Sequence, residues 1–357
     1  MESLNGRLNL KRFFMGKIVR LVVLSSAVIA LIFGLLAYNN FILANQVPAL
    51  DDYWIEIPTN SSFDEVVDLL KSKGVVTNET SFRWLADYME YKRDPMRSGR
   101  YQLKEGWSAI QLIRHLRGGK QSTMRVVLNS ARMLDDIAGK SAKFLEMDSS
   151  DIMGVLNDKD YIRGLGYSPE TLMSIFIPNS YDVYWNSSPT QFIERMKKEH
   201  DRFWDKDDRR QKAKALNLSP EEVYTLASIV ERETTKNDEK RRMAGVYLNR
   251  LRKGMLLQAD PTAVFARKDF AARRVTDYHT KFDSPYNTYM YKGLPPGPIS
   301  MASIASIDAV LNGEKHDYVY FCAKGDGTGY HNFAKSLAQH NRNAATYRAN
   351  LRRRGLR

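Results

Sequence analysis

The sequence predicts an α+β protein with one N-terminal transmembrane helix, one or more small αβ modules, and a C-terminal α+β domain. Three observations support this class. An uncharged run extends from Leu21 to Tyr38, and a strand-then-helix pattern occurs twice between positions 53 and 118. Beyond position 206, a strong helix start at Ser219 and an apolar strand-like run at 318–322 indicate helices combined with strands. A chain of 357 residues is long enough for two or three domains.

Positive charge is concentrated at the two ends of the chain. The net charge is +13, and the first 20 residues hold five basic side chains against one acid, while residues 342–357 hold six arginines and no acid. A nucleic-acid groove needs basic residues clustered on one folded face. We therefore expect no nucleic-acid partner, and basic tails at 1–20 and 346–357 that meet anionic lipid or serve solubility.

Cysteine and histidine give no sign of a metal or cofactor. The single cysteine, Cys322, excludes an internal disulfide and a multi-cysteine zinc site, and its apolar neighbours predict a strand thiol. The six histidines show no ligand pattern such as H-E-x-x-H. We expect no metal and no cofactor.

The uncharged run predicts a membrane anchor at 21–41. A helix of about 20 residues spans the hydrocarbon core of a bilayer. The basic stretch at 1–20 should stay in the cytoplasm, which places the rest of the chain outside. A cleaved signal peptide is the alternative, but its apolar core is usually only about 7–15 residues long, and residues 42–44 match a cleavage site poorly.

A short repeat follows the anchor. Residues 53–74 and 101–118 both read as strand, turn, amphipathic helix and terminal glycine. Gly74 and Gly118 occur where helix C-caps favour glycine, and residues 124–144 resemble a weaker third copy. The pattern predicts small αβ modules that either lie along an extended polymer or pack together as a spacer.

Residues 123–205 mix short helical patterns with a turn-rich stretch at 177–181. We expect them to form a connector between the module at 53–122 and a domain at 206–345.

Two acids follow the strongest helix start. Ser219-Pro220-Glu221-Glu222 combines a cap, a first-turn proline and a capping box. Glu231 and Glu233 lie at the edge of the apolar stripe that follows. Acids at i and i+2 do not face each other on a helix, so they are not a shared-proton dyad. Burial against an apolar face predicts a raised pKa for Glu231, as a general acid needs. The alternative is a pair of surface glutamates.

The later segments are rich in amides and tyrosines. Asn249, Gln258 and Asn287 offer both hydrogen-bond donors and acceptors to sugar hydroxyls. Tyr286 and Tyr289 offer rings on which a sugar face can stack. Taken singly, such residues more often form turns and caps.

Five ordered motifs resemble the catalytic region of the endolytic murein transglycosylases, the YceG-like family. They lie at 226–233, 246–262, 286–289, 293–299 and 318–341. The resemblance covers residues 223–341, about a third of the chain. Ala259 stands where the family motif usually has threonine, and the stretch 265–282 differs from the family pattern. The repeat at 53–122 is similar to the LysM-like subdomain of such proteins.

The resemblance implies a lytic transglycosylase with Glu231 as its catalytic acid/base. Glu231 would protonate the oxygen between MurNAc and GlcNAc, and the sugar would pass through an oxocarbenium-like state. The carboxylate would then take a proton from the MurNAc 6-hydroxyl, which closes on its own C1 to form a 1,6-anhydro end. The substrate supplies the nucleophile, so no second carboxylate is needed. We expect the substrate-binding residues to be Glu233, Asn249, Gln258, Asp260, Thr262, Tyr286, Asn287, Tyr289 and His331.

The implied setting is the bacterial inner membrane, with a single span and the catalytic domain on the extracytoplasmic side. The implied partners are peptidoglycan glycan strands and the bilayer, with peptidoglycan synthases as further candidates, and the implied role is to terminate strand elongation. The alternative is a non-catalytic, membrane-anchored scaffold that binds peptidoglycan. A hydrolase is a nearer alternative, and it would leave a reducing-end MurNAc.

Overall fold

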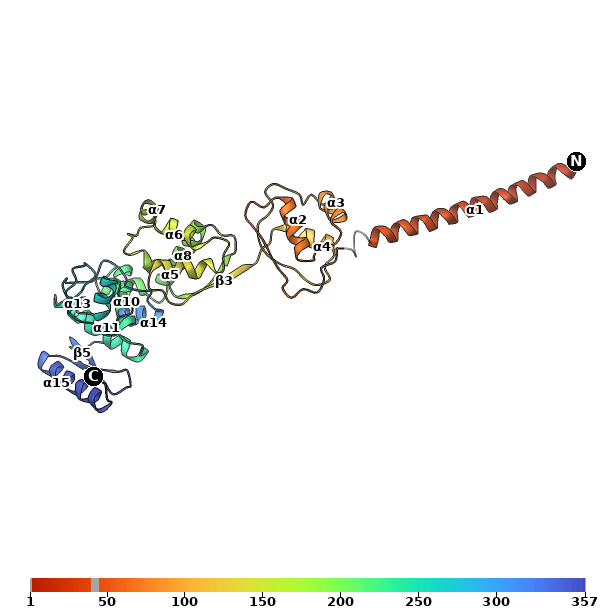
Figure 1. The fold of residues 1–357 in the computed structure, drawn as a ribbon. Helices are drawn as coiled ribbons and strands as arrows, with labels where there is room; N and C mark the ends of the chain where they lie inside the picture. The colour runs from red at the N-terminus through yellow and green to blue at the C-terminus, as the bar shows by residue number, and fades with distance from the viewer. Residues whose placement is uncertain (1, 40–44, 357) are drawn as a thin grey trace. The chain divides into compact units, whose positions relative to one another are not determined.

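The computed structural model describes residues 2–39 and 45–356, with side chains from residue 15 onward. The chain divides into two compact units, one formed by Met1–Thr123 with Tyr184–Asn186 and the other by Met124–Val183 with Ser187–Arg357 (Figure 1). Helices combine with two-stranded sheets in the described residues, which confirms the α+β class.

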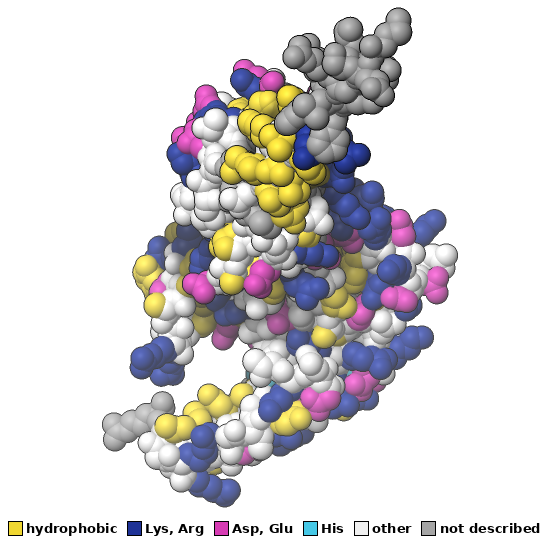
Figure 2. Space-filling model, turned by 90° about the vertical axis from the view of Figure 1, so that its right-hand side faces the viewer, with side chains coloured by type: hydrophobic (Ala, Val, Ile, Leu, Met, Phe, Trp, Pro, Cys, Tyr) yellow, Lys and Arg dark blue, Asp and Glu magenta, His cyan; other side chains and the backbone are white. Residues whose placement is uncertain are grey.

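The chain begins with the long helix α1 (Glu2–Tyr38). Its segment Met15–Tyr38 has 24 residues and contains an 18-residue stretch with a mean hydropathy of 2.5, and none of that stretch is buried. These side chains form the apolar patch beside the undescribed residues in Figure 2. At about 1.5 Å per residue the segment is about 36 Å long, enough to cross a hydrocarbon core of about 30 Å. One helix long and apolar enough to span is thus confirmed; residues 40–41 of the expected span lie outside the described residues.

The first unit contains both expected copies of the repeat. Its strands, β1 (Trp54–Ile57) and β2 (Gly99–Gln102), pair antiparallel. Its helices are α2 (Phe63–Ser72), α3 (Glu79–Tyr88) and α4 (Ala109–Gly118). The apolar faces of these elements share one core, so the two copies form a single small αβ body.

The helix ends in this unit follow local sequence signals. Capping boxes begin α2 at Ser62 and α4 at Ser108. Gly74, with φ 71°, follows the end of α2 as expected. At the end of α4 the left-handed cap is Gly119, with φ 65°, rather than Gly118, because the helix continues through Gly118 before the chain turns.

The second unit begins with β3 (Thr123–Leu128), which pairs with β4 (Asn179–Tyr184). Between and after these strands are α5 (Leu134–Ala142), α6 (Ser149–Leu156), α7 (Lys159–Gly164), the 3₁₀ helix η2 (Leu172–Ile175), α8 (Pro189–Trp204) and α9 (Arg209–Ala215). The weak third copy therefore has its strand and helix, β3 and α5, but its strand pairs with β4.

The remainder of the second unit is mainly helical. Its elements are α10 (Pro220–Glu233), α11 (Asn237–Arg252), α12 (Asp260–Arg267), α13 (Asp277–Thr280), α14 (Ile304–Leu311), the strands β5 (Tyr320–Ala323) and β6 (His331–Ala334), and α15 (Leu337–Arg353). Helix α10 packs against α11, α12 and α14. Strands β5 and β6 form a hairpin around the glycine-rich stretch 325–329, and Cys322 lies half-buried on β5, the strand that the apolar run at 318–322 predicts.

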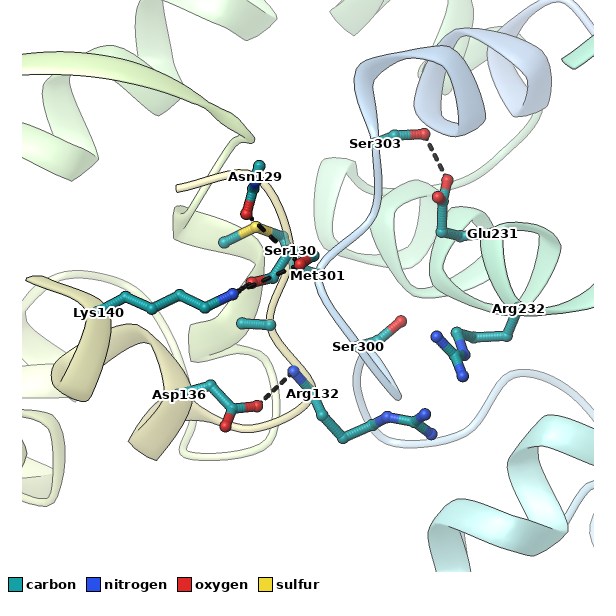
Figure 3. Close-up of a pocket in the computed structure, with 11 residues that line it drawn as sticks. Asn129, Ser130, Arg132, Asp136, Lys140, Glu231, Arg232, Ser300, Met301 and Ser303 are labelled. Carbon is teal, nitrogen blue, oxygen red and sulfur yellow. Dashed lines mark hydrogen bonds between the residues drawn. The ribbon is translucent and has the colours of Figure 1, made fainter. Parts of the chain in front are cut away.

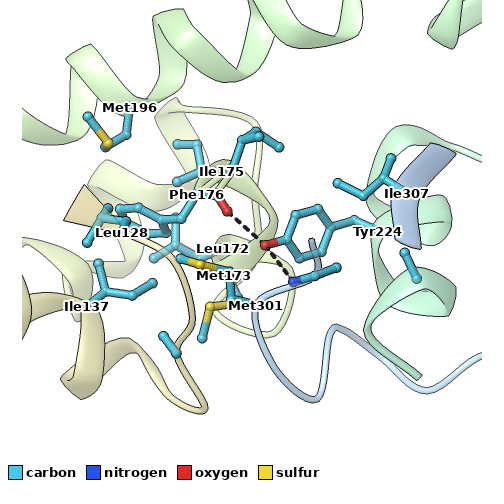
Figure 4. Close-up of a cluster of buried hydrophobic side chains, with 14 of the residues drawn as sticks. Leu128, Ile137, Leu172, Met173, Ile175, Phe176, Met196, Tyr224, Met301 and Ile307 are labelled. Atoms are coloured by element: carbon cyan, nitrogen blue, oxygen red, sulfur yellow. Dashed lines mark hydrogen bonds between the residues drawn. The ribbon is translucent and has the colours of Figure 1, made fainter. Parts of the chain in front are cut away.

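One apolar core joins the expected connector to the expected C-terminal domain. Figure 4 shows Leu128, Ile137 and Phe176 packed in the same cluster as Tyr224 and Met301. The chain is therefore not divided at 205/206, because side chains on both sides of that position bury one another. This packing brings the segment around residues 129–140 beside α10.

Candidate active site

Helix α10 holds the loop at 299–303 through three residues on one face. Tyr224, Ser228 and Glu231 are separated by four and three positions, which places them along one side of a helix. The Tyr224 hydroxyl donates to the Phe176 carbonyl at 2.7 Å and accepts from the Ala302 N–H at 3.2 Å (Figure 4). The Ser228 hydroxyl accepts from the Ile299 N–H at 3.0 Å. These contacts position the loop, and with it the start of α14, beside Glu231.

One oxygen of the Glu231 carboxylate is held by three donors. Oε2 accepts from Lys240 Nζ at 2.9 Å and from Ser306 Oγ at 2.5 Å, and also from Ser303 Oγ (Figure 3). Ser303 is the N-cap of α14 and accepts in turn from Lys240 at 3.3 Å and from the Ser306 N–H at 3.2 Å. Oε1 makes no hydrogen bond with any residue that the structure describes. The side chain of Glu231 is 29% exposed.

The expectation of a raised pKa at Glu231 is wrong for this arrangement. Partial burial is the largest single influence and raises the pKa, but the hydrogen bonds from Ser303, Ser306 and Lys240, with the charge of Lys240, outweigh it. The net result is a pKa below the ordinary value, because each donor favours the charged form. The carboxyl group is therefore ionised at neutral pH in this structure, contrary to the expected protonated resting state.

Glu231 lines a pocket of about 320 Å³. The other lining residues come from the segment after β3, from α5, from α10 and from the 300–303 loop: Asn129, Ser130, Ala131, Arg132, Asp136, Lys140, Arg232, Ser300, Met301 and Ser303 (Figure 3). The expected connector thus supplies one wall of the pocket. Sequence reasoning missed this wall because its residues lie about a hundred positions before Glu231.

Lys240 and the two serines were also missed. Lys240 lies in the run Lys236-Asn237-Asp238-Glu239-Lys240, which reads as a solvated helix surface, yet it is only 4% exposed. Ser303 has a visible signal, since it begins a helix, but that signal predicts a cap and not a contact with a carboxylate.

Glu233 belongs to a different cluster from Glu231, in agreement with the expectation that the two acids do not face each other. Burial raises the pKa of Glu233 to about 7, and the charge of Asp260 adds to this, while Tyr247 and Arg250 oppose it. The Tyr247 hydroxyl donates to Glu233 at 2.6 Å, and the Tyr289 hydroxyl donates to Asp260 at 2.5 Å.

Three of the expected substrate-binding residues are buried and hold the backbone. Asn249 donates to the carbonyls of residues 316 and 318 at 2.8 and 2.9 Å. Thr262 donates to the Ala259 carbonyl at 2.7 Å. Asn287 donates to the carbonyls of residues 279, 280 and 282. Their exposed fractions are 5%, 0% and 0%, so these side chains organise loops.

The other expected residues are more open, but none lines the pocket around Glu231. Gln258 is exposed, with a left-handed backbone (φ 49°), and accepts from Arg250 at 3.2 Å. Tyr286 is half-buried against Phe265, with ring centroids 4.8 Å apart. The His331 ring lies 2.9 Å from the buried carboxylate of Glu239. In the described part of the chain, no group of three or more metal-ligating side chains is gathered.

Comparison with known proteins agrees with this architecture. The sequence pattern of the YceG-like family matches residues 55–346 of this chain. A Bacillus subtilis (strain 168) protein named endolytic murein transglycosylase is 30% identical over 313 residues, covering 82% of this chain and 84% of its own length. A protein of the same name from Streptococcus pneumoniae serotype 2 is 26% identical, and the match covers 58% of its length. The crystal structure of a putative yceG-like protein from Listeria monocytogenes matches with a TM-score of 0.54 and 29% identity, over 81% of this chain and 97% of that one.

Proposed function

The chain belongs to the YceG-like family, and from that premise we propose that it is an endolytic murein transglycosylase. It would cut the bond between MurNAc and GlcNAc in nascent peptidoglycan and leave a 1,6-anhydro-MurNAc end. Relatives that carry the name match it over most of its length, and one observation in the site carries the proposal further.

That observation is the Glu231 carboxyl group, which has one held and one free oxygen in the pocket. Glu231 presents Oε1 while Oε2 is held. The other acid in the lining, Asp136, accepts through Oδ2 from the backbone N–H groups of Arg132 and Met133 at 2.7 and 3.0 Å, and so caps the start of α5. A reaction in which the sugar supplies its own nucleophile needs only one carboxyl group for proton transfer, and Glu231 has an oxygen available for it.

We propose that Glu231 transfers both protons through Oε1. A bound glycan removes water from the pocket, which raises the pKa of the carboxyl group and allows it to carry a proton. That proton goes to the glycosidic oxygen as the C1–O bond breaks. The carboxylate then accepts the proton of the MurNAc 6-hydroxyl as the hydroxyl oxygen bonds to C1. Glu231 thereby regains the proton that it gave to the glycosidic oxygen.

The expected substrate-binding residues divide into two groups in this proposal. Gln258, Asp260 and Tyr289, which are exposed or half-buried, contact the glycan outside the pocket. Asn249, Thr262, Asn287, Glu233, Tyr286 and His331 keep the surrounding loops and helices in place.

The remaining assignments are also proposals. Residues 53–122 form a LysM-like module that binds glycan strands, and the catalytic unit comprises 124–183 and 187–345, followed by the basic tail 346–357. The anchor crosses the bacterial inner membrane with residues 1–20 in the cytoplasm. Peptidoglycan synthases are the candidate partners, and the cut terminates strand elongation.

Digestion of purified peptidoglycan by Glu231→Gln tests the function. The amide keeps the shape of the side chain but cannot exchange the proton, so release of anhydro-muropeptides should fall by about 10²–10⁴-fold. Glu194→Gln, which changes an exposed acid on α8, is the matched control and should cut normally. Mass spectrometry of the products decides between the alternatives: a reducing-end MurNAc indicates a hydrolase, and glycan binding without any product indicates a scaffold.

A further inference from the structure

Two arginines line the pocket beside Glu231 without a carboxylate partner. The guanidinium groups of Arg132 and Arg232 extend toward the same side of the pocket (Figure 3). Burial lowers the pKa of Arg132, and the nearby charge of Arg232 lowers it further, so the two cations act on each other. Neither arginine joins an ion pair with any acid of the described residues. Two cations in one cavity repel each other, and an anion bound between them offsets this repulsion.

A buried hydroxyl with no partner lies at the same place. Ser300 is 3% exposed and lines the pocket. Its Oγ makes no hydrogen bond with the described residues, and in Figure 3 it points to the side where Arg232 lies. A buried hydroxyl without a partner destabilises the folded protein, so a ligand atom that accepts from it would be stabilising.

The other charged groups in the pocket are occupied. Lys140 donates to the Ser130 carbonyl. Asp136 is close enough to raise the pKa of Arg132, but its carboxylate receives backbone N–H groups, and Glu231 is paired with Lys240. The Arg132 guanidinium lies over the Phe270 ring, 4.6 Å from its centroid, but no acceptor among the described residues bonds to the side-chain N–H groups of either arginine or to the Ser300 hydroxyl.

We propose that Arg132, Arg232 and Ser300 bind a carboxylate attached to the muramyl sugar at the cut bond. The inference rests on the proposed function. Of the two alternating sugars, only the muramyl residue bears a lactyl group, whose carboxyl is free in peptide-free strands and linked to a stem peptide with carboxylates of its own in nascent strands. A guanidinium pair that accepts only this sugar sets the register of the strand, so that the linkage at the muramyl C1 lies at Glu231.

Three substrates distinguish the source of the carboxylate. They are peptide-bearing strands, peptide-free strands with a free lactyl carboxylate, and peptide-free strands in which that carboxylate is converted to a neutral amide. We expect Arg132→Gln and Arg232→Gln in the full chain to lower kcat/KM by about tenfold or more on a carboxylate-bearing strand, mainly through KM. Both variants should match the unaltered protein on the neutral strand. Whichever anionic strand shows the loss identifies the carboxylate. Arg163→Gln, at a side chain 75% exposed on α7, is the control.

Equal losses on anionic and neutral strands would mean a structural role and overturn the proposal, as would no loss on any strand. Ligand-observed NMR with N-acetylmuramic acid and N-acetylglucosamine gives a readout that does not need cutting. Preference for N-acetylmuramic acid, or for its peptide-bearing form, that Arg132→Gln abolishes supports the site, and binding of both no tighter than that of N-acetylglucosamine overturns it. If the unaltered chain releases no anhydro product from any strand, the proposed function fails, and the NMR result still decides the carboxylate site.

Discussion

The hydrogen bonds from Ser303, Ser306 and Lys240, together with the charge of Lys240, hold the pKa of Glu231 below its ordinary value. The ammonium group lies 2.9 Å from Oε2 and its side chain is only 5% exposed, so the pair is poorly screened by water. A general acid with a pKa below its ordinary value needs a change of surroundings before it can give up a proton. The two oxygens of the carboxylate therefore differ: Oε2 is held by three donors, whereas Oε1 is left without a described hydrogen-bond partner, as the proposed proton transfer through Oε1 requires.

Lys240→Met should shift the alkaline limb of the pH–rate profile upward. Removing Lys240 removes a hydrogen bond and a positive charge that both lower the pKa of Glu231, so this pKa should rise. The protonated form that donates to the glycosidic oxygen then persists to higher pH, and kcat/KM reports this in the free enzyme. Measured profiles of anhydro-product release check the shift. Lys253→Met, at an exposed position after the same helix, should leave the limb in place, and an unmoved limb in Lys240→Met would refute the assignment.

Glu233 makes stability depend on pH in the opposite sense from a salt-bridged acid. Its folded-state pKa is about 7 against an ordinary 4.5, so the folded protein holds a proton that the unfolded chain releases. Stability should therefore fall as pH rises between these two values and stay level above about 7.

Glu233→Gln should remove this pH dependence, which in the unaltered chain lowers the free energy of unfolding by up to about 3 kcal/mol from pH 4 to pH 8. The amide keeps an acceptor for Tyr247 and has no proton to lose. Denaturant unfolding across this pH range provides the measurement, with Glu194→Gln as the control. Parallel stability curves for the unaltered chain and Glu233→Gln would contradict the prediction.

At the scale of elements, α10 organises the site. Its buried face carries Tyr224, Ser228 and Glu231 in successive turns, and each makes hydrogen bonds to the segment 299–306. The helix therefore holds both the catalytic candidate and the loop that supplies its serine partners. The proline-rich stretch 293–298, which precedes that loop, lies against the backbone at Glu170.

Gly297→Ala tests that close approach. A Cβ at position 297 would lie 1.9 Å from the Glu170 carbonyl oxygen, so the backbone must move, and we expect a loss of about 1–3 kcal/mol of stability. Gly154→Ala in α6 is the matched control, because nothing lies within 4 Å of its added Cβ. There alanine should stabilise the helix by about 0.5–1 kcal/mol. Thermal unfolding should show opposite signs, and equal effects would refute the packing argument.

At the largest scale, the chain begins with one apolar helix and folds into two compact units, the first of which includes that helix. The first unit repeats a strand and a helix, and the second contains the whole pocket. The catalytic candidate and every residue that lines its pocket therefore belong to one body, whose geometry does not depend on the placement of the first unit.

The full chain should fractionate with membranes, while a variant that lacks residues 1–44 should remain in the soluble fraction. The apolar side chains of Met15–Tyr38 are unburied, so the bilayer is the environment in which they are stable. The uncleaved protein should begin at residue 1 or 2 by N-terminal sequencing. A mature start near Gln46 would instead identify a cleaved signal peptide.

Features that depend on neighbours along the chain could be predicted from the amino-acid sequence. The apolar helix, both copies of the repeat, the start of α10 at Ser219 and the β5–β6 hairpin all follow from hydrophobic periodicity, capping residues or turn residues. The ordered motifs also indicated the family before any fold was known.

The chemistry of the site depends on contacts between distant segments, which no local sequence pattern predicts. Ser303 and Ser306 are more than 70 positions from Glu231, and Arg132 is about a hundred positions before it. In sequence, a buried Lys240 and a solvated lysine look the same. The sign of the pKa shift at Glu231 is set by how many donors meet one oxygen, and that number is fixed when distant segments pack around a shared core.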